Sequence, residues 1–175
     1  MDLANASLYP TDQIEVNIDE LGKKVFGMNL GQQADKIISD ADIAIMDEYL
    51  FESFVAVVFN KQNYECFVTS RSGDKGVDVL ANGNKNFAIQ CKHCKTNVGN
   101  GAIQEVVAGA NYYKEKEQKT FLPCVVTNSG YTQQAIELAN TNQVELIDGK
   151  KLADMLAKTN VSWREVYEME HHRMG

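Results

Sequence analysis

The strongest helical pattern lies in residues 42–60, DIAIMDEYLFESFVAVVFN, where apolar residues recur at helical spacing. Ile45, Tyr49 and Phe54 are among these apolar positions. Such spacing places most of the apolar side chains on one face of a helix. We therefore expect one amphipathic helix that ends near Asn60.

Three short strands are expected in residues 64–93. YECFVTS and VDVLA are rich in β-branched and aromatic residues, and RSGDKG between them has the Gly, Asp and Ser residues of a turn. The next turn, NGNK, contains Asn-Gly, the strongest short-range signal for a β-hairpin. NFAIQCKH then returns as the third strand, so this segment predicts a small antiparallel meander.

The remaining chain alternates between helices and strands. We expect a helix in NVGNGAIQEVVAGANYYKEKEQ, a buried strand in TFLPCVVTN, a helix in YTQQAIELANTN, a strand in QVELID and a closing helix in GKKLADMLAKT. The order αβββαβαβα is typical of an α/β fold with a mixed central β-sheet flanked by helices. This domain is expected to span residues 42–158, between an N-terminal appendage at 1–41 and a C-terminal tail at 159–175 that ends in a frayed HHRMG.

Composition favours a single folded domain in the cytoplasm. The chain has 175 residues, of which 44% are hydrophobic and 23% charged, enough for a core. It has no apolar run of about 18 residues, so no membrane span is expected. The N-terminus lacks the basic and apolar segments of a secretory signal, and the four cysteines are irregularly spaced. We therefore expect a cytoplasmic protein with reduced cysteines.

The net charge of −7 argues at first against a nucleic-acid partner, but the charge is unevenly distributed. Residues 1–60 carry −8, residues 61–119 carry +3 and residues 120–175 carry −2. The basic middle segment is able to bind a polyanion with the help of a metal ion. The same segment is equally well interpreted as a solvated face on which charge fluctuates locally.

The stretch FAIQCKHCK, residues 87–95, has two interpretations. Cys91 and Cys94 form a CxxC with a histidine inside it, which suggests a small zinc or redox protein. The same stretch also completes the third strand, which then carries Gln90, Cys91 and Lys92. Zinc requires about four ligands, and residues three apart in a strand point to opposite faces, so the strand interpretation is favoured.

The strand interpretation brings several polar side chains together. Gln90 and Lys92 share one face because side chains alternate along a strand, and Cys91 points to the other face. Asp78 lies between two valines of the second strand, where a buried carboxylate requires a partner. The hairpin places Asp78 opposite the Gln90–Lys92 pair, and Glu52 on the first helix is able to join them. A core salt bridge between Asp78 and Lys92 is the structural alternative.

The sequence that contains these residues, FESFVAVVFNKQNYECFVTSRSGDKGVDVLANGNKNFAIQCK, resembles the catalytic core of the Mrr-like restriction endonucleases, in the PD-(D/E)xK nuclease superfamily. VTNSGYTQQAIELANTNQVELIDGKKLADML is similar to the later strand–helix–strand–helix segment of that family. The likeness covers residues 44–157 and implies a restriction-endonuclease-like core. It implies that Asp78 is the metal-binding aspartate, Lys92 the catalytic lysine and Glu52 an acid on the first helix. Gln90 stands where many superfamily members have Glu or Asp, and is similar to a variant among Mrr-like proteins.

The resemblance implies a bound divalent cation, Mg²⁺ with Mn²⁺ as a substitute, and such cations prefer oxygen ligands. Asp78 and Glu52 would supply carboxylate oxygens. Gln90 would supply its side-chain carbonyl and Cys91 its backbone carbonyl. Lys92 would hold the attacking water or stabilise developing charge. Basic residues on neighbouring turns are expected to contact the DNA phosphates, namely Arg71, Lys75, Lys85 and Lys95.

We therefore expect a metal-dependent endonuclease that hydrolyses DNA phosphodiester bonds, in restriction and defence or in DNA processing. The alternative is a catalytically inactive nucleic-acid-binding or assembly module with the same fold. A homodimer is a further hypothesis, because one such site cuts one strand and a double-strand cut needs two. A separate recognition or regulatory partner is also a hypothesis, because residues 1–41 are too short to be an obvious recognition domain.

Overall fold

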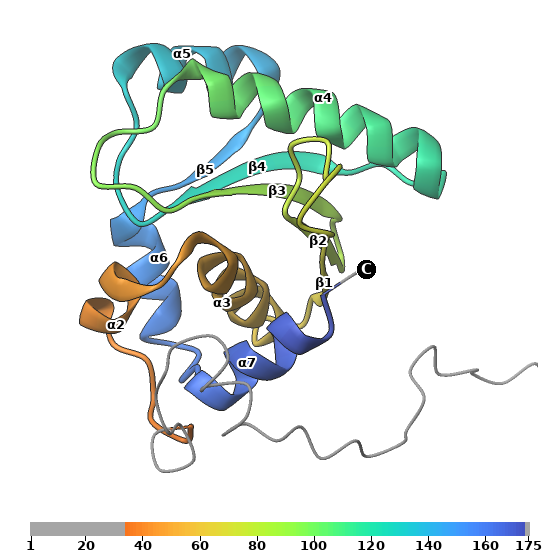
Figure 1. Ribbon diagram of the computed structural model, residues 1–175. Coiled ribbons are helices and arrows are strands. Elements are labelled where there is room, and N and C mark those ends of the chain that lie inside the picture. The colour runs from red at the N-terminus through yellow and green to blue at the C-terminus, as the bar shows by residue number, and fades with distance from the viewer. Residues whose placement is uncertain (1–33, 174–175) are drawn as a thin grey trace, which may run out of the picture.

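The sheet at the centre of the fold has five strands and is covered by helices on both faces (Figure 1). The computed structural model describes residues 34–173. The strands are β1 (Glu65–Val68), β2 (Val79–Asn82), β3 (Phe87–Lys92), β4 (Leu122–Thr127) and β5 (Glu145–Ile147). This arrangement confirms the predicted α/β class, with a central sheet and flanking helices.

The strands lie in the sheet in sequence order, β1-β2-β3-β4-β5, and the pairing changes direction at β3. β1, β2 and β3 pair antiparallel, with Val79 opposite Ile89. β4 and β5 run parallel to β3, with Gln90 opposite Val125. Parallel neighbours need crossover connections, which two helices supply here. The antiparallel meander and the mixed sheet are both confirmed.

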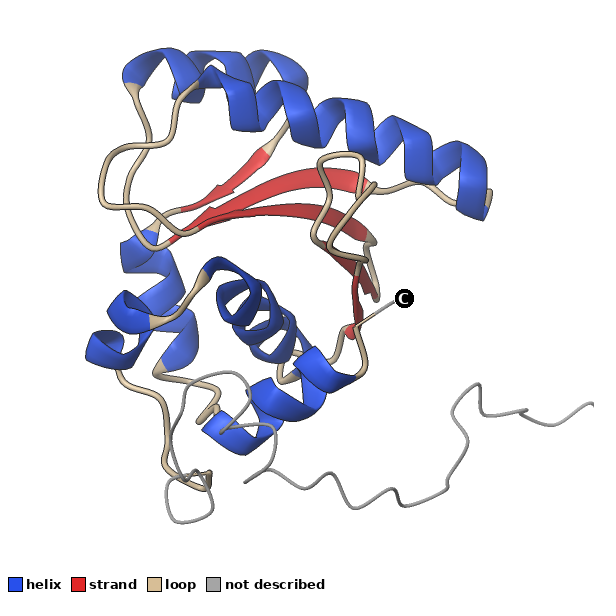
Figure 2. Cartoon of the chain, viewed as in Figure 1, coloured by secondary structure: helices blue, strands red, loops and turns tan. Residues whose placement is uncertain are grey.

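Two layers of helices enclose the sheet, and Figures 1 and 2 show them on opposite faces. One layer consists of the two crossover helices, α4 (Asn100–Glu117) and α5 (Gln133–Asn142). The other layer contains the helices α2 (Asp40–Ile45), α3 (Glu48–Asn60), α6 (Gly149–Leu156) and α7 (Trp163–His171). No helix among the described residues is long and apolar enough to cross a membrane.

The single helix predicted for residues 42–60 is in fact two helices, α2 and α3, with a break at Met46 and Asp47. Met46 has an extended backbone, with a ψ angle of 147°. The carboxylate of Asp47 accepts a hydrogen bond from the backbone N–H of Leu50 at 2.8 Å, and so caps the start of α3. Because the chain turns at this cap, Ile45 is 74% exposed instead of lying on the buried face.

Helix α3 is the centre of the larger core because it is buried along almost its whole length. Leu50, Phe51, Phe54, Val55 and Val58 are each at most 1% exposed. They pack in one cluster with side chains from all five strands and from α6 and α7. Full burial of a side chain of this kind stabilises a fold by about 1.5–3 kcal/mol. This packing fixes the position of α3, which carries one of the candidate site residues.

The C-terminal tail predicted for residues 159–175 contains a helix in the structure, α7. The helix starts with a capping box, in which the side chains of Ser162 and Glu165 bond each other's backbone N–H groups. Trp163 and Tyr167 are buried in the same cluster as α3. The expectation of a frayed C-terminal end is therefore wrong for the described residues, because an apolar face of α7 docks on the core.

Residues before the predicted domain also pack into the core. Ala34 is fully buried and Ile38 is 3% exposed, and the N–H of Ile38 donates to the carbonyl of Val161 at 2.8 Å. The packed unit therefore includes described residues on both sides of 42–158, while the domain boundaries themselves stay a prediction. Residues 1–33 of the predicted appendage lie outside the described residues.

Candidate active site

Asp78 lies where the pairing between β2 and β3 ends. Its N–H donates to the carbonyl of Ile89 at 2.8 Å and its carbonyl accepts from the N–H of Thr69 at 2.9 Å, so its backbone is held from both neighbouring strands. Gln90 lies opposite, and its Nε2 donates to Asp78 Oδ2 at 2.8 Å. The hairpin thus brings Asp78 and Gln90 into direct contact, as the alternation of side chains indicated.

The backbone of Cys91 makes the second contact with this carboxylate. Its N–H donates to Asp78 Oδ2 at 2.6 Å. The carboxylate thus takes the place of the backbone carbonyl that a longer β2 would offer to this N–H. The N–H and C=O groups of one strand residue point to the same side, so the carbonyl of Cys91 also faces the end of β2. Oδ1 of Asp78 accepts no hydrogen bond from the described residues, and is available to another ligand.

The side-chain oxygen of Gln90, Oε1, is buried and has no hydrogen-bond partner within the described part of the chain. Gln90 is 6% exposed and lines the same cavity as Asp78. A buried carbonyl oxygen without a partner costs about 1–3 kcal/mol. A cation or a ligand that donates a hydrogen bond would remove this penalty. Gln90 Oε1 therefore marks a place for a ligand beside Asp78.

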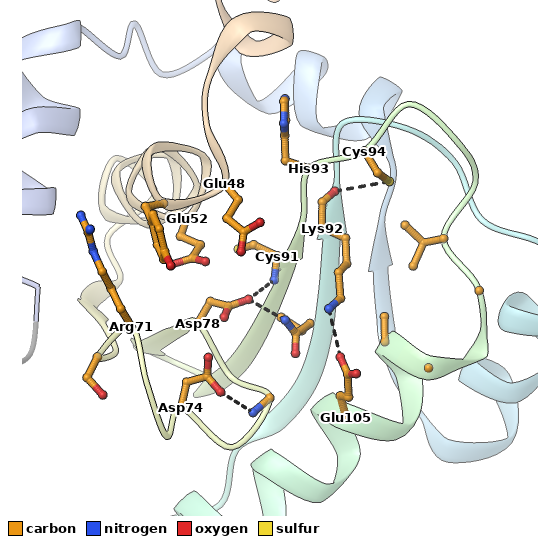
Figure 3. Close-up of a pocket in the computed structure, with 18 residues that line it drawn as sticks. Glu48, Glu52, Arg71, Asp74, Asp78, Cys91, Lys92, His93, Cys94 and Glu105 are labelled. Atoms are coloured by element: carbon orange, nitrogen blue, oxygen red, sulfur yellow. Dashed lines mark hydrogen bonds and ion pairs between the residues drawn. The ribbon is translucent and has the colours of Figure 1, made fainter. Parts of the chain in front are cut away.

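Glu52 reaches this cavity from α3 (Figure 3). It is 8% exposed, so it is not a solvated residue on the outer face of an amphipathic helix. Its Oε2 pairs with Nη1 of Arg173 at 2.6 Å. Figure 3 shows the carboxyl groups of Glu52 and Asp78 extending into the same cavity, from α3 and from the residue just before β2.

Both carboxyl groups hold a proton more tightly than usual. Burial raises the pKa of Asp78 to about 7, although the N–H of Cys91 favours the charged form. Burial also raises the pKa of Glu52 to about 8, and the charge of Asp78 adds to this rise while Arg173 opposes it. Repulsion between two such acids is relieved when a cation binds between them. The pair therefore favours a positively charged ligand.

Lys92 lies at the rim of the cavity, with 35% of its side chain exposed. Its Nζ pairs with Oε2 of Glu105, on α4, at 3.0 Å. Between residues 34 and 173 there is no ion pair of Lys92 with Asp78, so a core salt bridge between these two is not what the structure forms. An ion pair as exposed as this one contributes only about 0–1 kcal/mol, so Glu105 is easily replaced by another anion.

The cavity shared by these residues has a volume of about 690 Å³. It is lined by α3, the loop before β2, the end of β3 and the start of α4. A water molecule in the liquid occupies about 30 Å³, so the cavity has room for a hydrated cation together with a phosphate group. Asp74, Glu48 and Glu105 also line the cavity, so together with Glu52 and Asp78 it has five acidic residues in its wall (Figure 3).

Three of the four predicted phosphate-contacting residues lie around this cavity. Arg71 lines it, with the guanidinium 4.2 Å above the ring of Tyr49. Lys75 and Lys95 are exposed on loops whose neighbouring residues line it. Lys85 lies in the turn between β2 and β3, at the opposite end of these strands from the cavity. The structure therefore does not bring Lys85 together with the others.

Among residues 34–173 the CxxC is not brought together with other metal ligands, and its two thiols are free. Cys91 is buried in the core and Cys94 lies in the following loop, where its N–H is bound by the side chain of Asn128. His93 contacts the carbonyl of Ile43 through Nε2 at 2.9 Å. In the part of the chain that the structure describes, no group of three or more His, Cys, Asp or Glu residues is placed to hold a metal. Only two of the predicted magnesium ligands, Asp78 and Glu52, would bind through side chains of these types, because Gln90 and Cys91 would donate carbonyl oxygens.

The structure adds residues that the sequence did not identify. Glu170 on α7 pairs with Arg173, which lies just after this helix and binds Glu52, and Glu105 binds Lys92. The capping box Ser-Trp-Arg-Glu that starts at residue 162 was a readable signal for α7. No pattern in the sequence indicated that the end of this helix reaches Glu52.

Comparison with known proteins agrees with this architecture. The family model of the Mrr catalytic domain, described as a restriction endonuclease, matches residues 43–156. That match covers well over half of the chain and includes Glu52, Asp78, Gln90 and Lys92. No curated protein is significantly similar in sequence.

Two solved structures have a similar fold. A protein of unknown function, AF1548, has a TM-score of 0.50 and 16% sequence identity, over 58% of this chain and 58% of its own. The DNA modification-dependent restriction endonuclease AspBHI has a TM-score of 0.50 and 13% identity, over 96% of this chain and 49% of its own. The present chain thus spans about half the length of each, and at these identities the likeness concerns the fold.

Proposed function

The chain belongs to the restriction endonuclease family of the Mrr catalytic domain, and on this premise we propose that it is a metal-dependent nuclease that hydrolyses phosphodiester bonds in DNA. One observation carries the proposal. The unpartnered Oε1 of Gln90 is buried in the cavity that also contains the carboxyl groups of Asp78 and Glu52. Three oxygen donors of this kind, two of them acidic, match the preference of Mg²⁺.

The oxygen atoms that would hold the cation come from three elements. Asp78 would bind through Oδ1 and Gln90 through Oε1, since neither atom accepts a hydrogen bond from the described residues. Glu52 would bind through Oε1, because Oε2 is paired with Arg173. The backbone carbonyl of Cys91 completes the set. When bound, Mg²⁺ or Mn²⁺ supplies positive charge that lowers the pKa of a water molecule and neutralises the phosphate.

Lys92 is the residue that we assign to the attacking water or to the developing charge on the phosphate. Its ammonium group donates hydrogen bonds as a point charge and needs no fixed fork geometry. Glu105 now holds it at the rim of the cavity at 3.0 Å. A phosphate group that enters the cavity replaces Glu105 as the partner of Lys92, which then lies next to the reacting atoms.

DNA is the proposed substrate, and the basic residues near the cavity are proposed to bind its backbone. Arg71 lines the cavity, and Lys75 and Lys95 are exposed on loops whose neighbouring residues line it. Contacts of this type give affinity without reading sequence. AspBHI, which has a similar fold, is a restriction endonuclease that depends on DNA modification. Recognition of a particular sequence or modification would come from a partner or from a further domain, and double-strand cutting from a homodimer.

The second candidate is a nucleic-acid-binding module without catalysis. The observation that favours it is the ion pair of Glu52 with Arg173, which already neutralises one of the proposed metal ligands. Such a module would bind DNA at the same cavity, but it would neither bind Mg²⁺ through Asp78 nor cut the chain.

A cleavage assay separates the two functions. Supercoiled plasmid and single-stranded DNA are incubated with the wild type, Asp78→Asn and Lys92→Ala, in Mg²⁺, Mn²⁺ or EDTA. We expect metal-dependent nicking or linearisation by the wild type, and a loss of about 100-fold or more in both variants. Lys85→Ala, at the far end of the sheet, is the matched control and should cut like the wild type. DNA binding without cutting in any metal would support the non-catalytic module.

A further inference from the structure

Arg173 lies just after α7, beyond the region that the family model matches, which ends at residue 156. Only 7% of its side chain is exposed, although it stands next to the end of the described chain. Its guanidinium group reaches back to α3 and contacts Glu52 directly. A residue outside the matched region is therefore part of the site.

Every N–H group of this guanidinium has a partner. Nη1 donates to Glu52 Oε2 at 2.6 Å and to the carbonyl of Thr69 at 3.2 Å. Nη2 donates to the carbonyl of Tyr49 at 2.9 Å and to Glu170 Oε2 at 2.6 Å. Nε donates to both oxygens of Glu170, at 3.1 and 3.0 Å. With all its donors in use, Arg173 is a fixed support and not a mobile phosphate ligand.

Glu170 balances the charge of Arg173 on the side away from the cavity. Its Oε2 also accepts a hydrogen bond from Ser53 at 2.6 Å, and its Oε1 pairs with Arg71 at 2.6 Å. Glu52, Arg173, Glu170 and Arg71 thus form a chain of alternating charges. Because Arg173 lies between two carboxylates, its positive charge is neutralised locally and does not exclude a cation from the cavity.

The contact with Arg173 fixes one half of the Glu52 carboxylate. A glutamate side chain has three rotatable bonds, and a free one must lose that freedom before it binds a metal. In the structure Oε2 is held by Arg173, while Oε1 accepts no hydrogen bond from any described residue. The side chain is therefore arranged in advance, with one oxygen ready for a ligand.

We propose that Arg173 is a positioning residue for the divalent cation: it orients Glu52 so that Oε1 completes the oxygen donors offered by Asp78, Gln90 and Cys91. This inference rests on the proposed nuclease function. It extends the site to a segment outside the matched family region, and it assigns α7 a part in metal binding. In the opposite role, Arg173 would occupy the place of the cation and compete with it. Substitution of Arg173 would then strengthen metal binding instead of weakening it.

Metal affinity measured without DNA tests the inference directly. Mn²⁺ is titrated into the full chain, and the free Mn²⁺ is followed by electron paramagnetic resonance. The loss of a residue that orients a metal ligand typically weakens metal binding by about 10- to 100-fold, and we expect Arg173→Gln to weaken it by about 10-fold or more. Arg164→Gln is the matched control, because Arg164 lies on α7, the helix that precedes Arg173, but pairs with the exposed Asp35. It should bind Mn²⁺ like the wild type.

A double-mutant cycle shows whether Arg173 acts through Glu52. In a Glu52→Gln background, Arg173→Gln should have little further effect on Mn²⁺ affinity, because the oriented carboxylate is already absent. Arg173→Lys keeps the charge but not the planar fork, so it should bind Mn²⁺ more weakly than the wild type and more tightly than Arg173→Gln. If Arg173→Gln does not fold, as judged by circular dichroism, Arg173→Lys decides the question alone.

Three results would overturn the inference. Equal or tighter Mn²⁺ binding by Arg173→Gln would show that Arg173 is a structural residue or a competitor of the cation. Equal binding by Arg173→Lys and the wild type would show that the fork geometry does not matter. No Mn²⁺ binding by the wild type would instead remove the proposed metal site altogether, and the inference with it, so the failure of the two proposals is distinguishable.

Discussion

Replacing Asp78 with asparagine is expected to stabilise the metal-free protein at neutral and alkaline pH. The substitution keeps the size of the side chain, and its carbonyl oxygen can still accept the hydrogen bonds that Gln90 Nε2 and the N–H of Cys91 donate to Oδ2. It removes a negative charge from a side chain that is only 5% exposed. Polar groups that are placed for chemistry commonly reduce the stability of a fold in this way.

The expected gain follows from the raised pKa of Asp78. Burial raises it from an ordinary value of 3.8 to about 7. Between these values the unfolded chain has released the proton while the folded chain keeps it, so the wild-type free energy of unfolding falls as the pH rises, by about 1.4 kcal/mol per pH unit. From about pH 5 to about pH 7 the wild-type free energy of unfolding therefore falls by at most about 3 kcal/mol. Relaxation of the protein around the charged carboxylate reduces this fall to about 1–3 kcal/mol.

Urea unfolding of the wild type and of Asp78→Asn measures this difference. In EDTA, the free energy of unfolding of the variant should exceed that of the wild type by an amount that grows from pH 5 to pH 7. Above the pKa of Asp78 in the folded state this difference should change less. Mg²⁺ should then stabilise the wild type at pH 8, because a ligand that binds only the folded state shifts the equilibrium toward it, and should have little effect on the variant. Glu105→Gln is the control, since it removes an exposed carboxylate from the rim of the same cavity.

Two results would refute this reasoning. A variant that is less stable than the wild type at pH 8 in EDTA would show that the fold already satisfies the charge of Asp78. A difference in free energy of unfolding between the variant and the wild type that does not change with pH would show that the carboxyl group of Asp78 ionises in the folded protein as it does in the unfolded chain. In either case the raised proton affinity of Asp78, which favours a bound cation, would be absent.

The packing around the site leads to two further predictions. Gly109→Ala should lower the free energy of unfolding by about 1–3 kcal/mol and reduce cleavage, because overpacking destabilises a fold by about this amount. The added Cβ would lie 2.5 Å from both the carbonyl oxygen of Lys75 and Cγ2 of Val77, in the loop before Asp78. Gly101→Ala, on the same helix with open space around the added Cβ, is the control and should change stability by less than about 1 kcal/mol. A thiol-reactive dye should label Cys94 alone in the native protein, because the other three cysteines are buried. Rapid labelling of a second cysteine would contradict the packing of the strand that carries it, which is β1 for Cys66, β3 for Cys91 and β4 for Cys124.

The hairpin and the residues that it carries could be predicted because short-range signals determine them. Asn-Gly at position 82 fixes the turn, and the alternation of side chains then decides which residues share a face. The observed register pairs Val79 with Ile89, which places Asp78 opposite Gln90. No information from distant parts of the chain is needed for this contact.

The environment of Glu52 could not be predicted in the same way, because it depends on a contact across 121 residues. The capping box at the start of α7 predicts a helix, but it does not say where that helix docks. Apolar periodicity likewise continued through Met46 and Asp47, where the structure has a break, because periodicity does not register the capping preference of an aspartate. Closeness in sequence groups Lys85 with the site, but in the structure Lys85 lies in the turn between β2 and β3, at the end of these strands that is far from the cavity.

The ion pair between Glu52 and Arg173 has a consequence for protein engineering. A chimera that borrows only residues 43–156, the region that defines the family, would carry Asp78 and its neighbours but leave α7 behind. Glu52 would then be buried without its guanidinium partner, and removing one member of a buried ion pair typically costs about 3–5 kcal/mol. The apolar face of α3 on which α7 packs would also become exposed to solvent and prone to aggregation. A portable unit for fusion to a new targeting domain therefore has to include α7 and Arg173.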